Sequence, residues 1–168
     1  MNIDGASSKI RAMRATDRED VAEALVECGA FTDEEVRVAL EMVDAGLEGD
    51  YSLPSVEVAG RVSAYACIGK APLTAASWYI YWICVHPAVQ GAGIGRLLEA
   101  YIEEFVRAAG GDRLVVETSS MPAYERARRF YERAGFSLTG RIPDFYKPHD
   151  DCIVLFKKLS QGPAAALR

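Results

Sequence analysis

The spacing of apolar residues changes along the chain, and each spacing predicts a type of element. Helical spacing predicts helices over residues 32–49, 94–109 and 122–134. A further helix is expected from Thr16 to about Cys28, because Thr16 and Glu19 have the spacing of a capping box, which Thr32 and Glu35 repeat. Gly29 and Gly49 suit the ends of the first two helices. Apolar runs predict strands over residues 9–15, 55–60, 61–69, 78–85, 113–119, 136–141 and 151–159.

In chain order these elements give β-α-α-β-β-β-α-β-α-β-β. The stretch WYIYWICV (78–85) is continuously apolar, which predicts a central strand buried on both faces. The alternation of strands and helices predicts an α/β (α+β) protein with a mixed sheet and helices on both faces. A length of 168 residues suits one domain. We expect that domain over residues 9–160, with residues 1–8 and 161–168 as flexible tails.

Net charge, cysteine spacing and hydropathy limit the classes of partner and the compartment that we expect. The net charge of −5 argues against a nucleic-acid partner, since such proteins are usually basic. The cysteines Cys28, Cys67, Cys84 and Cys152 form no C-x-x-C pair, and we expect structural thiols in a reducing compartment. No stretch approaches the length of a membrane span, and the N-terminus lacks the apolar core of a signal peptide, so we expect a cytoplasmic protein without a membrane partner.

The candidate chemistry begins where strand 78–85 ends. Gly91, Gly93 and Gly95 follow it closely and a long helical stripe begins at once. This G-x-G-x-G spacing differs from the dinucleotide and P-loop patterns. Glycines before a helix N-terminus nevertheless suit a phosphate group, because backbone N–H groups can face it. A tight turn without a ligand is the alternative that the glycines alone leave open.

Two motifs carry a resemblance to a known family. The stretch from Gln90 to Gly95, QGAGIG, is similar to the Q/R-x-x-G-x-G/A signature of the GNAT superfamily of N-acetyltransferases, and ARRFYERAGF (127–136) resembles the A-x-x-F-Y-x-x-x-G-F motif of that family. The resemblance covers roughly residues 9–159. It implies a mostly antiparallel sheet of about seven strands with four helices, splayed between the fourth and fifth strands. It also implies transfer of an acetyl group from acetyl-CoA to a primary amine in a ternary complex, without a metal.

The resemblance assigns cofactor-binding positions residue by residue. Backbone groups of Ile83, Cys84 and Val85 would bond the pantetheine arm, and Gln90, Gly91, Ala92, Gly93, Ile94, Gly95 and Arg96 would hold the pyrophosphate. Tyr124 and Phe130 are further candidates for contact with coenzyme A. Tyr124 stands where the family often has an asparagine, so this position departs from the family pattern.

Catalysis requires two proton transfers. An alkylammonium has a pKa of about 10.4, so only about one molecule in a few thousand is a free nucleophile at pH 7. Tyr131 matches the family tyrosine that points at the CoA sulfur and is the candidate acid. The family carboxylate on the fourth strand is replaced by Tyr79, so the base is expected to be Glu117, with Asp144, His149 or a water relay as alternatives. Cys84 has no obvious histidine partner for a role as nucleophile.

The acceptor is left open by the sequence. Phe31, Tyr79 and Tyr146 are expected to border the acceptor site, by analogy with the family. A small molecule or a peptide amine would both suit the chemistry, and a homodimer is neither indicated nor excluded. The rival interpretation is a GNAT-like module that binds acyl-CoA without turnover, which the missing strand carboxylate favours.

Overall fold

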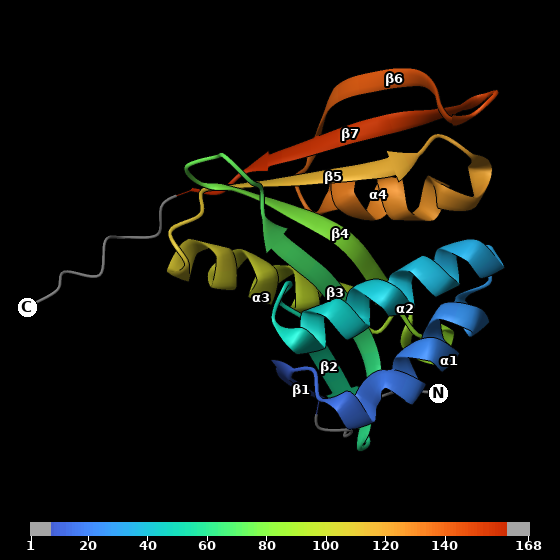
Figure 1. Ribbon diagram of the computed structural model, residues 1–168, viewed down its shortest axis with the longest axis vertical. Coiled ribbons are helices and arrows are strands. Elements are labelled where there is room, and N and C mark those ends of the chain that lie inside the picture. The colour runs from blue at the N-terminus through green and yellow to red at the C-terminus, as the bar shows by residue number, and fades with distance from the viewer. Residues whose placement is uncertain (1–7, 161–168) are drawn as a thin grey trace, which may run out of the picture. The chain divides into compact units, whose positions relative to one another are not determined.

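The computed structural model describes residues 8–160 (Figure 1). The elements in chain order are β1 (Ser8–Ala12), η1 (Ala15–Asp17), α1 (Arg18–Cys28), α2 (Asp33–Glu48), β2 (Pro54–Val58), β3 (Arg61–Lys70), β4 (Ser77–Val85), η2 (Pro87–Val89), α3 (Ile94–Ala108), β5 (Arg113–Ser119), η3 (Pro122–Tyr124), α4 (Glu125–Arg133), β6 (Ser137–Lys147) and β7 (Asp150–Lys158), where η denotes a 3-10 turn. The predicted order of strands and α-helices is confirmed. The predicted tails lie outside the described residues, except for Ser8, which belongs to β1.

The strands form a seven-stranded sheet in the order β1-β2-β3-β4-β5-β7-β6. Only the β4–β5 pair is parallel among the strand pairings with a described register, and its ladder joins Ser77–Tyr79 to Arg113–Val115. A parallel pair needs a crossover connection, which α3 supplies. Together with the four α-helices of the described part of the chain, this confirms the predicted fold class.

The chain comprises two compact units. The first consists of the described residues of Met1–Gly69 together with Ile80–Ile102. The second consists of Lys70–Tyr79 with the described residues of Glu103–Arg168. The single domain expected over residues 9–160 stays a prediction.

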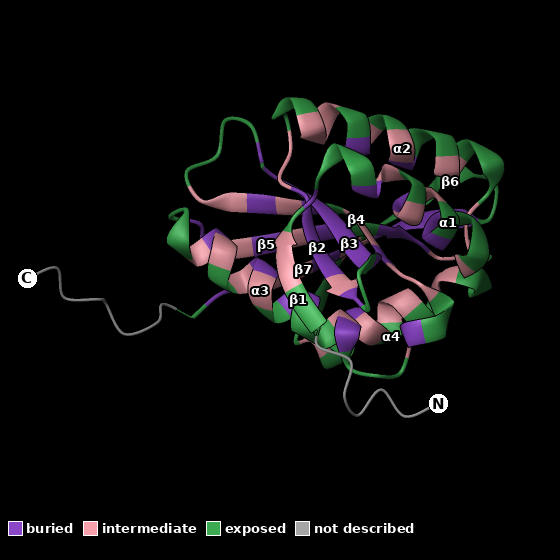
Figure 2. Cartoon of the chain, turned by 90° about the horizontal axis from the view of Figure 1, so that it is seen from below, coloured by how far each residue is buried: buried purple, intermediate pink, exposed green. Residues whose placement is uncertain are grey.

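In the first unit, α2 has the ends that its sequence predicts. The Glu35 N–H donates to the Thr32 hydroxyl at 3.3 Å, and the Thr32 N–H donates to the Glu35 carboxylate at 2.7 Å, which completes the capping box. Gly49 ends the helix with a φ of 110°, and Gly29 ends α1 with a φ of 65°. Along α2 the side away from the core is exposed (Figure 2).

The start of α1 differs from the prediction. The capping box expected at Thr16 and Glu19 is wrong, because α1 begins directly after Asp17. The Asp17 carboxylate accepts the Arg14 N–H at 2.7 Å, which closes the preceding 3-10 turn. Two guanidinium nitrogens of Arg11 also donate to this carboxylate, at 2.6 and 2.9 Å. A charged, nearly buried acceptor therefore fixes the helix start in place of the Thr16 hydroxyl.

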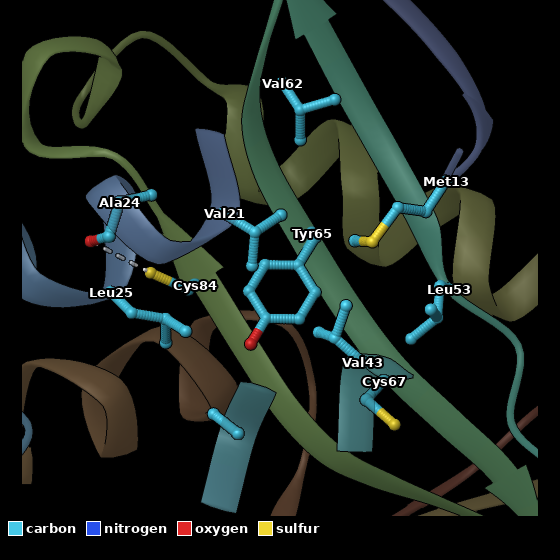
Figure 3. Close-up of a cluster of buried hydrophobic side chains, with 11 residues drawn as sticks. Met13, Val21, Ala24, Leu25, Val43, Leu53, Val62, Tyr65, Cys67 and Cys84 are labelled. Carbon is cyan, nitrogen blue, oxygen red and sulfur yellow. Dashed lines mark hydrogen bonds between the residues drawn. The ribbon is translucent and has the colours of Figure 1, made fainter. Parts of the chain in front are cut away.

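The core of the first unit joins the two N-terminal helices to β3 and β4 (Figure 3). The contributing side chains include Val21, Ala24 and Leu25 from α1, Ala39 and Val43 from α2, Tyr65 and Cys67 from β3, and Cys84 from β4. The intervening β3 residues Ala64, Ala66 and Ile68 are buried as well. Burial on both faces makes β3 an interior strand.

Regular alternation breaks in β4 at Tyr81 and Trp82. A Cβ added to Gly69 of β3 would approach both Tyr51 and Tyr81, whose rings lie 5.3 Å apart. Trp82 packs against the same core cluster as Tyr51, with its ring 5.2 Å from that of Phe31. Successive residues of a regular strand point to opposite faces. Because these two neighbours face the same side, β4 carries one extra residue, in the manner of a β-bulge.

This irregularity corrects one expectation for β4. Trp78, Ile80 and Cys84 are buried, but Tyr81 is 37% exposed and the remaining residues of the strand are half-buried. Burial on both faces is therefore wrong for its second half. After the extra residue, the side chains of β4 exchange faces. The ladder between β4 and β5 ends at Tyr79.

The second unit is built on β5, β7 and β6. β5 pairs with β7 over its whole length, from Arg113 opposite Lys158 to Ser119 opposite Cys152. β6 pairs with β7 less regularly and is exposed along nearly all of its length. In the described part of the chain, no helix is both long and apolar enough to cross a membrane.

Candidate functional site

The glycine loop in the first unit is held by polar side chains of the loop itself. The Ala88 N–H donates to Nδ1 of His86 at 3.1 Å, which caps the turn η2. The side-chain amide of Gln90 donates to the carbonyl of Val85 at 2.8 Å. The Gln90 side chain therefore closes the loop onto the end of β4, and its contact with a cofactor stays a prediction.

Gly91 and Gly93 give the loop an open backbone. Each has a φ of 83°, a left-handed conformation that favours glycine, and a Cβ added at either position meets nothing within 4 Å. Their N–H groups have no hydrogen-bond acceptor among the described residues. The first N–H groups of α3 follow directly, and a helix has no internal acceptors for them. This arrangement suits an anion such as a pyrophosphate.

The other residues predicted for this loop differ in their exposure and therefore in the groups that a ligand could contact. Ala92 and Arg96 are exposed and Gly95 is half-buried, whereas Ile94 is 6% exposed. Ile94 therefore anchors the start of α3 in the interior and can contribute only its backbone to a ligand. The residues predicted to hold pyrophosphate thus run from the loop, Gln90 to Gly93, into the start of α3.

The end of β4 supplies the predicted pantetheine contacts Ile83, Cys84 and Val85. Cys84 is 3% exposed, and its thiol donates to the carbonyl of Ala24 in α1 at 3.5 Å. Its side chain is thus committed to the core, and only its backbone remains for a ligand. Ile83 and Val85 are half-buried. One lone pair of the Val85 carbonyl is already used by Gln90.

In the second unit, the second motif forms α4 and the start of β6. Tyr131 is 4% exposed and stacks edge-on against Phe130 and Phe136 at 5.3 and 5.2 Å. This packing fixes the orientation of the tyrosine ring. Phe130 is half-buried, and Tyr124 is the half-buried N-cap residue of α4. The motif residues are therefore grouped at one helix, as their spacing predicts.

Glu117, the candidate base, belongs to a polar group on one face of β5 and β7. Ser119 lies directly opposite Cys152, and Glu117 lies two residues before Ser119 on the same face. The Tyr146 hydroxyl donates to the Cys152 sulfur at 3.8 Å, and the Ser119 hydroxyl donates to the Asp150 carboxylate at 2.5 Å. Burial raises the pKa of Tyr146, and the negative charges of Glu117 and Asp150 act in the same direction. The structure thus places the predicted Glu117 and Tyr146 near each other.

Asp150, which accepts a hydrogen bond from Ser119, is a member of this group that the sequence alone did not single out. Asp150 is 5% exposed, and its described side-chain partner is a neutral hydroxyl. A buried carboxylate is costly unless it is hydrogen-bonded, and the Ser119 hydroxyl supplies such a bond. Only the register of β5 against β7 brings the two together, and that register is set by distant parts of the chain.

The alternative bases Asp144 and His149 lie at the tip of β6 and β7. Asp144 has a φ of 52°, its N–H donates to Asp151, and its carboxylate accepts the His149 N–H at 2.6 Å. Arg141 also bonds Asp151. Asp144 is therefore engaged in shaping this turn, in which Phe145 is exposed.

The other predicted acceptor contacts occupy different places. Phe31 packs against the core cluster and Trp82 in the first unit. Tyr79 pairs with Val115 in the second unit and is half-buried. The Phe31 ring is mainly a packing element, and its contact with an acceptor stays a prediction, as does that of Tyr79.

One further polar cluster lies beside the glycine loop. Atoms of Glu23, Glu27 and His86 that could bind a metal lie within 4.8 Å of one another. Because Nδ1 of His86 accepts the Ala88 N–H, a neutral ring has its proton on Nε2, which lies 3.1 Å from Glu27. Arg61 also bonds Glu23 at 2.7 Å. These groups already serve one another as donors and acceptors, so they join α1 to the start of the loop.

Comparison with known proteins agrees with the family that the glycine loop and the α4 motif resemble. Residues 18–136 match the model of the acetyltransferase (GNAT) family. A GNAT-family protein from Desulfovibrio desulfuricans is 36% identical, covers 92% of this chain and 100% of its own, and superimposes with a TM-score of 0.87. No curated protein matches the chain.

More distant structures share the fold. The ribosomal-protein-S18-alanine N-acetyltransferase of Escherichia coli is 18% identical, with a TM-score of 0.75 over 96% of this chain and 100% of its own. The yncA protein of Salmonella typhimurium, solved with acetyl-CoA, is 21% identical, with a TM-score of 0.71 over 96% of this chain and 99% of its own. The protein described here belongs to the GNAT family of acetyltransferases.

Proposed function

We propose that this protein transfers an acetyl group from acetyl-CoA to a primary amine by direct attack within a ternary complex. The observation that carries the proposal is the glycine loop. Two left-handed glycines with unpaired N–H groups precede the N-terminus of a 15-residue helix. Space where a Cβ would otherwise stand lets a phosphate approach the backbone closely.

The residues that would hold acetyl-CoA are those of the loop and the strand before it. Gln90 to Arg96 would bond the pyrophosphate, and the backbone of Ile83 to Val85 would bond the pantetheine arm. β4 is suited to this because its ladder with β5 ends at Tyr79, which leaves later backbone groups to find other partners. Phe130 and Tyr124 would add contacts from α4. Acetyl-CoA supplies the activated acyl group as a thioester.

Two side chains would move the protons. Glu117 accepts a proton from the acceptor ammonium, directly or through a water, because only the neutral amine is a nucleophile. Tyr131 donates its hydroxyl proton to the departing sulfur, and its stacking on Phe130 and Phe136 restricts the ring to one orientation. Tyr146, whose hydroxyl bonds Cys152, would border the acceptor beside Glu117. Phe31 and Tyr79 are the remaining proposed acceptor contacts.

The test is thiol release from acetyl-CoA with a panel of amines that includes polyamines, amino acids, aminoglycosides and short peptides. We expect at least one amine to give turnover. Glu117→Gln should lower kcat about 100-fold or more, since general bases contribute about 10² to 10⁴. Glu104→Gln is the matched control, because Glu104 is an exposed carboxylate in α3.

Two results would count against the proposal. Acetyl-CoA binding without turnover on any amine would favour the rival function, a binding module that has lost catalysis. Turnover that survives Glu117→Gln undiminished would remove Glu117 as the base and leave Asp144, His149 or a water relay in its place.

A further inference from the structure

Two cysteines that are distant in the sequence, Cys28 and Cys84, lie together in the first unit. The Cys84 thiol donates to the carbonyl of Ala24 at 3.5 Å. In an α-helix that carbonyl also accepts the N–H of the residue four positions later, which is Cys28. Cys28 packs against the core cluster that contains Cys84, and the two thiols are hydrogen-bonded to each other.

The two thiols differ in their access to solvent. Cys84 is 3% exposed within the core, whereas Cys28 is half-buried at the last residue of α1. A small oxidant can therefore reach the pair from the side of Cys28. Gly29 follows with a left-handed φ of 65°, so the helix ends immediately beyond this cysteine.

The contact with Cys28 also affects the pKa of Cys84. The hydrogen bond with Cys28 raises the pKa of Cys84, and burial raises it further. Cys84 therefore keeps its proton and can donate it when the disulfide closes. A thiolate is the form of cysteine that reacts with peroxides.

We propose that Cys28 and Cys84 form a dithiol site that reacts with hydroperoxides and closes a disulfide between α1 and β4. The Cys28 thiolate attacks one peroxide oxygen, the O–O bond breaks, and Cys28 becomes a sulfenic acid while the other oxygen leaves and takes up a proton. Cys84 then forms the S–S bond, its proton joins the leaving hydroxide, and water departs. Two sulfurs are oxidised and one hydroperoxide is reduced to water or an alcohol.

The remaining cysteines are placed differently. Cys67 is fully buried, and burial raises its pKa to about 12. Its sulfur points away from Cys84, and the Tyr65 ring lies between the two residues (Figure 3). Cys152 lies in the second unit, where it accepts a hydrogen bond from Tyr146. The reaction should therefore be selective for one pair of the four cysteines.

The sequence makes the test direct, because trypsin places each cysteine on its own peptide. Cys28 falls on peptide 19–37, Cys67 on 62–70, Cys84 on 71–96 and Cys152 on 142–157. The reduced protein is treated with hydrogen peroxide, alkylated after denaturation, and digested without reductant. We expect a linked species of peptides 19–37 and 71–96 that lacks two hydrogens, and a fall in alkylated cysteines from four to two.

Variants separate this site from general oxidation. Cys28→Ser, at the half-buried position, should abolish the linked species, while Cys67→Ser should leave its yield unchanged. Oxidised methionine in the same digest shows that peroxide reached the protein. Absence of the linked species in such a sample, or a link that joins Cys67 instead, would overturn the proposal. The readout is independent of acetyl transfer, so failure here leaves the proposed function unaffected.

Discussion

Replacing Gly93 by alanine should separate the fold of the glycine loop from its role in binding acetyl-CoA. Gly93 has a φ of 83°, and an added Cβ meets nothing within 4 Å. The added methyl group therefore causes no clash in the folded state. The left-handed conformation of a residue with a Cβ costs about 1–2 kcal/mol. Alanine also lowers the conformational entropy of the unfolded chain, which offsets about 0.4–1 kcal/mol of that cost. The net loss should be about 1 kcal/mol, or about 2–4 °C in Tm for a chain of this size.

Binding should suffer more than stability. If the methyl group keeps the pyrophosphate from one backbone N–H, the lost charged hydrogen bond costs about 1.5–3 kcal/mol. That corresponds to a loss of affinity of about tenfold to a hundredfold. Calorimetric titration of acetyl-CoA into the wild type and into Gly93→Ala would measure the change directly, and thermal melting would report the stability of each.

Gly110→Ala is the matched control. Gly110 has a φ of 79° and equally empty space around an added Cβ, but it follows α3, whereas Gly93 precedes it. Its stability cost should be the same and its acetyl-CoA affinity unchanged. Equal affinity losses in the two variants would refute the reasoning, because the effect would then come from general loosening. An unchanged affinity in Gly93→Ala would refute the pyrophosphate assignment itself.

Three further predictions concern Tyr131 and the Arg11–Asp17 pair. Tyr131→Phe preserves the stacked ring, so kcat should fall at least tenfold while the melting temperature shifts by only a few degrees; undiminished thiol release would exclude Tyr131 as the acid. Arg11→Met should lower the free energy of unfolding, measured in urea, by about 2–3 kcal/mol. Breaking a fully buried pair costs about 3–5 kcal/mol. The loss should be smaller here because Asp17 keeps its hydrogen bond from the Arg14 N–H and its side chain is 10% exposed to solvent. Hydrogen bonds from Arg11 hold the pKa of Asp17 below its usual value, so the stability it contributes is present above about pH 4 and is lost as pH falls through the lowered pKa. Arg11→Met should flatten that acid limb of the stability curve, and an unaltered limb would contradict this account.

Local chemistry predicted much of the fold. Thr32 and Glu35 interact within one helical turn, and Gly29 needs only its own backbone freedom, so both were readable from short segments. Thr16 and Glu19 show the same spacing but fail as a cap. There the Asp17 carboxylate holds the Arg14 N–H and Arg11 as well, and a fixed charge is the stronger acceptor.

The parts of the candidate site that could be predicted are those whose residues lie close together in the sequence. The glycine loop and the Phe130-Tyr131 pair lie in compact motifs and were located by spacing. Asp150 gave no such signal, because its relation to Ser119 depends on the register between β5 and β7. The hydrogen bond between Cys28 and Cys84 likewise requires the packing of α1 against β4. In β4, every residue of WYIYWICV is apolar, so no alternation could reveal the extra residue.

That extra residue has a consequence for how relatives of this chain should be aligned. Tyr81 and Trp82 share one face, so the strand returns to regular alternation if either is omitted. A relative one residue shorter here would match on both sides only with a gap at this point. Without the gap, every later position of the strand would be exchanged between interior and exterior, because a shift of one residue reverses the faces. Cys84 would then be equated with an outward-facing residue, and the glycine loop would begin one position out of step.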